Sequence, residues 1–184
     1  LGLLIGAILG GLTGLLWASY NPIKIVPPYI HLRLFSFLTA LVGIVVGRGT
    51  GFVTGYVATQ VWALLAGAFV APHQLLFDGI FVGLTGWIPA VIVRGDKTFA
   101  EMFREVQNNK RLWFLKAAIA GGISGLFMSF FVASSLELTT PLTFWVSFWA
   151  IGVISDTPPL LLTGPLTYGV MKAVRRASSW MPQF

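Results

Sequence analysis

Long apolar stretches separated by short polar segments run through the whole chain. Between Tyr29 and Arg94 there are three such stretches with almost no ionic residues inside them. A helix needs about 20 predominantly apolar residues to cross the hydrocarbon core of a bilayer. We therefore expect an all-α integral membrane protein, a six-helix bundle forming a single transmembrane domain over residues 1–184. The predicted spans cover about residues 3–17, 34–46, 51–70, 75–93, 112–134 and 159–175.

The apolar segment 141–154 lies just before the last predicted span and is short for a helix that crosses a bilayer. Its length predicts a re-entrant or interfacial helix. The last span then has a recognisable start, because Asp156 and Thr157 can cap a helix and prolines 158 and 159 suit its first turn.

The longest polar stretch, residues 95–111, predicts a short amphipathic helix at the cytoplasmic surface. Thr98 followed by Glu101 forms a capping-box pattern. The apolar side chains that would share one face of this helix are Phe99, Met102, Phe103 and Val106.

The composition supports a membrane protein. The hydrophobic fraction is 56% and the charged fraction 10%, whereas a soluble domain carries about a quarter charged residues. The chain has no cysteine, which excludes disulfides and thiolate metal sites. Its net charge of +6 comes from basic residues at the ends of apolar segments, which indicates membrane orientation and not nucleic-acid binding.

The basic residues are unevenly distributed between the two sides of a six-span protein. One side would hold only Lys24 and Arg33. Because basic residues favour the cytoplasmic side, both termini of this multi-pass protein are predicted to be cytoplasmic. The cytoplasmic side would hold Arg48, Arg94, Lys97, Arg104, Lys110, Arg111, Lys116, Lys172, Arg175 and Arg176.

Glycines repeat every fourth residue on the first predicted span, at Gly6, Gly10 and Gly14. They would form one nearly bare helix face, which lets another helix approach closely. That helix could belong to this chain or to another membrane subunit. No basic region precedes the segment, which favours a true span over a processed signal peptide.

Two carboxylates fall near the outer ends of predicted spans, Asp78 in the fourth and Asp156 at the start of the last. A carboxylate near lipid is unfavourable unless it faces a cavity or a partner. The two could line one pocket, or each could cap a helix. Glu137 in the outer loop could join the pocket or be solvated.

Aromatic residues also gather on the predicted outer side. They could form an interfacial belt, or the floor of a site for a flat cationic ligand. His31 and His73 fall in outer loops without a third metal ligand, so no metal site is predicted. No phosphate-binding loop or nucleophile elbow is present, which indicates a binding protein without a cofactor and not an enzyme. The aromatic residues are Tyr29, Trp62, Phe77, Phe81, Phe144, Trp145, Phe148 and Trp149.

Several features follow one another in a recognisable order over about residues 3–176. They are a small-residue first span, a proline-containing loop over 20–33, Ile-His-Leu at 30–32, Gly-Thr-Gly-Phe at 49–52, the glycine-rich stretch 81–94 that ends in arginine, and the Asp-Thr-Pro-Pro start at 156–159. This order resembles the substrate-binding S components of energy-coupling factor (ECF) vitamin transporters. Arg33-Leu34 stands where many members carry Gly-Asp.

The resemblance implies a membrane-embedded subunit of an ATP-driven micronutrient uptake transporter in a bacterial or archaeal plasma membrane. Its partners would be a transmembrane coupling subunit, docked on Gly6, Gly10 and Gly14, and two cytoplasmic ATPases. The two carboxylates suggest a cationic heteroaromatic ligand such as thiamin or its pyrimidine. The implied substrate-binding residues, near the extracellular face, are Tyr29, His31, Arg33, His73, Asp78, Glu137, Trp145, Trp149 and Asp156.

Two other readings of the sequence stay open. The chain could be a non-transport membrane scaffold or an accessory subunit of a larger membrane complex, without saturable ligand binding. It could also be a small channel or ion-coupled carrier that works alone, although no inverted repeat is visible.

Overall fold

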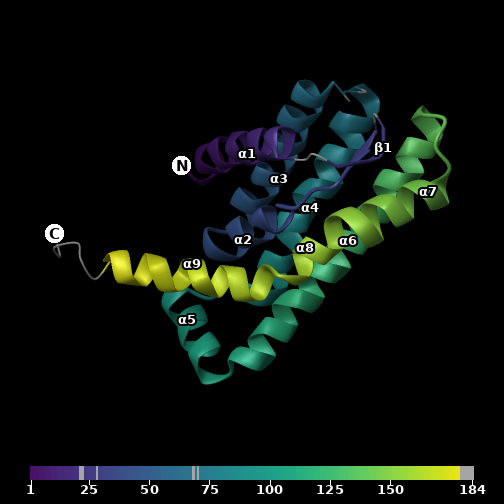
Figure 1. Ribbon diagram of the computed structural model, residues 1–184. Helices are drawn as coiled ribbons and strands as arrows, with labels where there is room; N and C mark the ends of the chain where they lie inside the picture. The colour runs from purple at the N-terminus through teal and green to yellow at the C-terminus, as the bar shows by residue number, and fades with distance from the viewer. Residues whose placement is uncertain (21–22, 28, 68, 70, 179–184) are drawn as a thin grey trace.

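The structure, a computed structural model, is all-helical apart from one short hairpin, and it describes residues 1–20, 23–27, 29–67, 69 and 71–178 (Figure 1). The start of α1 and the end of α9 lie on the left of Figure 1, away from β1 and α7. The elements are α1 (Gly2–Ser19), β1 (Lys24–Val26), β2 (Ile30–His31), α2 (Phe37–Val45), α3 (Arg48–Ala66), η1 (His73–Asp78), α4 (Gly79–Pro89), η2 (Ala90–Arg94), α5 (Phe99–Asn108), α6 (Lys110–Thr139), α7 (Phe144–Phe148), η3 (Trp149–Asp156), α8 (Thr157–Leu161) and α9 (Thr163–Ser178), where η marks a π-helical segment.

Four helices in the described part of the chain are long and apolar enough to cross a membrane: Gly2–Ser19, His73–Arg94, Lys110–Thr139 and Phe144–Arg176. The predicted count of six spans is therefore not confirmed. Helix α2 has nine residues, about 14 Å of helix, which is too short for a bilayer.

Helix α3 is nineteen residues long but carries glycines, threonines and Gln60. It packs between α1, α2 and α4, so much of its surface faces protein and not lipid. It ends at Ala66 because Gly67 adopts a left-handed conformation with φ of 71°. The predicted end of this span, Val70, lies outside the described residues.

Helix α6 has the reversed polarity that lipid imposes. Its buried face combines small and polar residues, such as Gly121, Ser124 and Ser129, with a few large ones such as Trp113 and Met128. Large side chains cover its outer face, an arrangement that suits an apolar solvent better than water. These exposed residues are Leu112, Leu115, Ile119, Ile123, Leu126, Phe127 and Phe130.

The segment expected as a separate re-entrant or interfacial helix, 141–154, instead joins the last long helix, which begins at Phe144. Helix α7 and η3 continue directly into α8, so Asp156 lies within the helix and makes no N-terminal cap. A proline cannot donate a backbone hydrogen bond and crowds the preceding turn. The wider turn of η3 immediately before prolines 158 and 159 accommodates both effects.

The glycines of α1 pack inside this chain, which is the first of the two alternatives above. Gly6, Gly10 and Gly14 are buried against α3. A Cβ atom on Gly10 would lie 2.7 Å from the carbonyl oxygen of Thr54, and one on Gly14 would lie 2.6 Å from that of Ala58. The glycine face is therefore covered and is not open to another subunit.

A second close approach joins α2, α3 and α4. Gly43, Gly51 and Gly86 meet backbone to backbone, and a Cβ on Gly86 would lie 2.3 Å from the carbonyl oxygen of Gly51. Because these glycines have no side chains, α2, α3 and α4 can pack closely against one another at this point.

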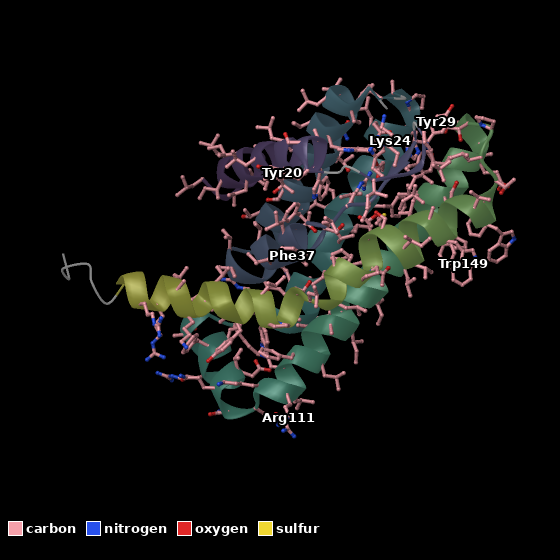
Figure 2. All side chains as sticks on the ribbon, viewed as in Figure 1. Tyr20, Lys24, Tyr29, Phe37, Arg111 and Trp149 are labelled. Carbon is pink, nitrogen blue, oxygen red and sulfur yellow. The ribbon has the colours of Figure 1, made fainter. Side chains whose placement is uncertain are left out.

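Helix α5 lies at the end of the molecule opposite the hairpin (Figure 1). The capping box of Thr98 and Glu101 is formed as predicted, and its hydrogen bonds from Thr98 lower the pKa of Glu101. The apolar face of α5 packs on Trp113 of α6 and Met171 of α9, so the protein and not lipid covers it. Figure 2 places Arg111 at this end, far from Lys24 and Tyr29.

The α1–α3 packing predicts a large difference between two neighbouring glycines. Gly10→Ala should destabilise the protein by about 1–3 kcal/mol, because the new methyl group overlaps the α3 backbone. Gly11→Ala is the matched control, since a Cβ there meets nothing within 4 Å. Thermal unfolding in detergent measures both. Equal midpoints for the two variants would contradict this packing.

Candidate functional site

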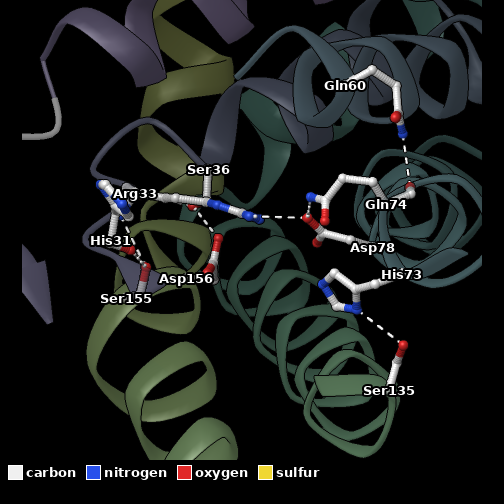
Figure 3. Close-up of polar contacts among 10 residues, drawn as sticks. All are labelled: His31, Arg33, Ser36, Gln60, His73, Gln74, Asp78, Ser135, Ser155 and Asp156. Carbon is white, nitrogen blue, oxygen red and sulfur yellow. Dashed lines mark hydrogen bonds and ion pairs between the residues drawn. The ribbon is translucent and has the colours of Figure 1, made fainter. Parts of the chain in front are cut away.

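A buried polar cluster lies where the hairpin meets the helices, and Arg33 is at its centre (Figure 3). Strands β1 and β2 pair antiparallel, and the short linker after β2 carries Arg33 into the protein. The side chain of Arg33 is only 8% exposed. A buried charge requires partners, so its surroundings indicate what this end of the protein is built to hold.

The first partner of Arg33 is Asp78, the last residue of η1. Arg33 Nη2 lies 3.2 Å from Asp78 Oδ2, and the carboxylate is 1% exposed. Gln74, one turn earlier, donates from Nε2 to the same oxygen at 2.7 Å. Gln60 of α3 in turn donates to the backbone carbonyl of Gln74 at 2.8 Å, which ties η1 to α3.

The second set of partners comes from η3. The backbone N–H of Arg33 donates to Ser155 Oγ at 2.9 Å, and that hydroxyl donates to the carbonyl of His31 at 2.9 Å. Asp156, 3% exposed, accepts from the Ser36 hydroxyl at 2.7 Å and also interacts electrostatically with the guanidinium. Two carboxylates from separate elements therefore face one arginine.

Aromatic rings complete the surroundings of the guanidinium. The Arg33 Cζ atom lies 4.5 Å from the ring centre of Trp62 on α3 and 5.3 Å from that of Trp17 on α1. Both distances are within the range of cation–π attraction. His31 packs edge-on against Trp62, with ring centres 5.4 Å apart. Four segments of the chain thus converge on one side chain.

A small cavity opens beside this cluster, with a volume of about 20 Å³. That volume holds about one water molecule and is far below the roughly 300 Å³ of a small-molecule site. Arg33 Nη1 and Asp78 Oδ1 are buried without a hydrogen-bond partner among the described residues. The lining residues are Tyr29, Ile30, His31, Arg33, Trp62, His73, Gln74, Asp78, Val132, Leu136, Ile151 and Asp156.

Six of the nine predicted substrate-binding residues line this cavity, and three do not. Glu137 is exposed and accepts a hydrogen bond from the backbone of Phe144 at 3.1 Å. Trp145 and Trp149 are 66% and 55% exposed and lie outside the cavity. Their exposure favours the interfacial-belt alternative for these two aromatics. The six that the structure brings together are Tyr29, His31, Arg33, His73, Asp78 and Asp156.

Sequence reasoning missed the polar side chains that position the charges, Gln74, Ser36 and Ser155. Gln74 sits four residues before Asp78, a spacing that places both on one helix face and could have marked the pair. The serines gave no such signal, because Ser36 meets Asp156, and Ser155 meets Arg33, across separations of the chain that only the fold closes.

Neither His31 nor His73 belongs to a group of side chains arranged to bind a metal ion in the described part of the chain. His73 contacts Ser135 on α6 at 2.9 Å through Nδ1. Within the described residues, no group of three or more His, Asp or Glu side chains is arranged to hold a metal ion. The chemistry this cluster offers is therefore hydrogen bonding, charge pairing and ring stacking.

Comparisons with known proteins add no assignment, since no protein-family model, curated protein or solved structure matches this chain.

The ion pair predicts a strong effect of removing its acidic partner. Asp78→Ala removes the ion-pair partner of Arg33 and leaves its guanidinium buried without it. This should destabilise the protein by about 3–5 kcal/mol. Asp96→Ala is the control, since this carboxylate is exposed and its loss should change stability by less than about 0.5 kcal/mol. Thermal unfolding of the purified variants measures both. A shift for Asp78→Ala no larger than for Asp96→Ala would show that the pair is not stabilising.

Proposed function

We propose that this protein is the membrane-embedded substrate-binding subunit of an ATP-driven micronutrient uptake transporter. Its ligand binds in the cavity beside Arg33, Asp78 and Asp156. The hairpin end faces the outside of a bacterial or archaeal cell, and both termini face the cytoplasm. A transmembrane coupling subunit and two cytoplasmic ATPases supply the energy for transport.

One observation carries this proposal: a charged, partly unsatisfied cluster is buried inside a protein whose outer surface is apolar. Ionisable groups within a membrane protein are unfavourable and usually mark a pathway or a ligand site. Here two acidic groups and one basic group share a single cavity. Two of their polar atoms, Arg33 Nη1 and Asp78 Oδ1, have no partner in the described part of the chain and are available to a ligand.

Ligand entry requires the hairpin to move. A cavity of about 20 Å³ cannot hold a vitamin-sized molecule, so the space must expand before such a ligand binds. Tyr29, Ile30 and His31, in or next to the short strand β2, form one wall of the cavity. Such a movement must break the contacts of Arg33 with Asp78 and Ser155 and expose the buried strand β2.

The proposed ligand is a cationic heteroaromatic compound of the thiamin or aminopyrimidine type. Asp78 and Asp156 supply two negative charges against the one positive charge of Arg33. Trp62 supplies an aromatic face for stacking, which the Arg33 guanidinium covers in this structure. A planar cation would match both features.

The proposed coupling subunit must contact a surface other than the glycine face of α1, because α3 covers that face. The opposite side of α1 is open and apolar, with Leu4, Ile8 and Leu12 all more than half exposed. This leucine-rich side is where we place the contact with the coupling subunit.

Ligand binding and partner recovery test the proposal together. Titrating cationic vitamins into the purified protein should change tryptophan fluorescence saturably, since Trp62 borders the cavity and Trp17 stacks on Arg33. Asp156→Asn should weaken binding at least about tenfold, because a hydrogen bond to a charged group contributes about 1.5–3 kcal/mol. Extraction from the native membrane should also recover two ATPases and a membrane subunit.

Glu137→Gln is the matched control for the titration, because Glu137 is acidic but lies outside the cavity. Its affinity should equal that of the unmodified protein. The proposal fails if no cationic micronutrient gives a saturable response and no ATPase is recovered.

The small cavity volume favours one second candidate, a scaffold or accessory subunit of a membrane complex. In that case the Arg33–Asp78 pair would hold the hairpin on the helices and would never open. This candidate predicts recovery of membrane partners without ATPases and without saturable ligand binding.

A further inference from the structure

The guanidinium of Arg33 is held the way a protein holds a bound organic cation. It lies over the ring of Trp62 at 4.5 Å, pairs with Asp78 at 3.2 Å and is buried from solvent. An aromatic face combined with a carboxylate is the usual recognition surface for a planar cation. Here the cation is part of the protein's own chain.

The residues that hold the guanidinium belong to other elements than Arg33 itself. Trp17, Trp62 and Asp78 lie on α1, α3 and η1. Arg33 is in the linker between β2 and α2, and its backbone N–H is fixed to Ser155. The receptor surface is thus built on helices, whereas the group occupying it is attached to the hairpin. Movement of the hairpin would withdraw the cation and leave the receptor surface intact.

The fit of Arg33 is also incomplete. Its Nη1 atom and Asp78 Oδ1 are both buried and unpartnered among the described residues, beside a cavity with space for about one water molecule. A structural arginine is usually satisfied at both ends of its planar fork. The site therefore offers more hydrogen-bonding capacity than this side chain uses.

We propose that Trp62, Asp78 and Asp156 form a binding site for planar guanidinium- or amidinium-type cations, and that Arg33 occupies it as a tethered substitute until a ligand displaces it. The inference rests on the proposed function for the role of the cavity as a ligand site. It adds the ligand's charge group and a built-in competitor. If Arg33 fills the site about nine-tenths of the time, it weakens the apparent affinity for the ligand about tenfold.

Replacing Arg33 and supplying a free cation tests this inference directly. Arg33→Ala should lower the thermal unfolding midpoint, and millimolar methylguanidinium should restore it saturably. Sodium chloride at the same ionic strength and urea, which is planar but uncharged, should not. The unmodified protein should need about tenfold more methylguanidinium for the same rise, because Arg33 competes for the site.

A second substitution shows where the cation acts. Combining Arg33→Ala with Asp78→Asn should abolish the effect of methylguanidinium, whereas combining it with Asp96→Asn should preserve it. The proposal is overturned if methylguanidinium stabilises the unmodified protein and Arg33→Ala equally, or stabilises neither.

Poor folding of Arg33→Ala would not prevent the test. Arg33→Gln fills part of the same space and can still donate to Asp78, which favours folding. Because this variant lacks the positive charge, methylguanidinium should still bind and shift its tryptophan emission saturably. If neither variant is recovered even when methylguanidinium is present during extraction, Arg33 has an irreplaceable structural role and the proposal fails. If methylguanidinium restores Arg33→Ala but the unmodified protein binds no vitamin, only the proposed ligand is refuted. If the unmodified protein binds a vitamin but methylguanidinium does not restore Arg33→Ala, only the role of Arg33 as a tethered substitute is refuted.

Discussion

The buried ion pair between Arg33 and Asp78 is the constraint on which the outer end of this protein depends. Both side chains are almost fully buried, and two charges removed from water are tolerated only when they are paired and hydrogen-bonded. Gln74 satisfies the same carboxylate oxygen, and Ser155 fixes the backbone that carries the guanidinium. Because Trp17 and Trp62 also pack on Arg33, one side chain holds the hairpin, α1, α3, η1 and η3 together.

The rest of the fold explains why such a cluster can exist inside an apolar protein. Glycines let α1, α2, α3 and α4 approach until their backbones touch, which leaves little room for side chains between them. Many large apolar residues lie on the outer surface, as on α6, while small and polar groups are buried beside the apolar core. π-Helical segments shift the helical register at η1 and η3, and the two carboxylates are their last residues, Asp78 and Asp156.

The sequence predicted the helical class, the first three of the four long apolar helices and the capped helix α5, because each depends on local pattern and length. The predicted spans over 34–46 and 51–70 are not among the four. The sequence did not predict that 141–154 would join the last helix. Prolines 158 and 159 are typical of a helix start, and no sequence pattern marked the π-helical segment η3 that lets the helix continue through them. Likewise, the glycine repeat of α1 indicated a close helix contact but could not identify the partner, which is α3. At the site, Asp78 and Asp156 were found from their depth in the predicted spans, whereas Tyr29, His31, Arg33 and His73 came from the family resemblance. The contacts of Ser36 with Asp156 and of Ser155 with Arg33 leave no local signal.

A double-mutant cycle on Arg33 and Asp78 tests the central claim most directly. The free energies of unfolding of Arg33→Ala, Asp78→Ala and the double variant give the coupling between the two side chains, independently of their other contacts. A buried, directly paired arrangement predicts a coupling energy above about 1 kcal/mol, with the double variant less unstable than the sum of the two single changes. Additive effects, within about 0.5 kcal/mol, would show that the two side chains do not interact and would contradict the account.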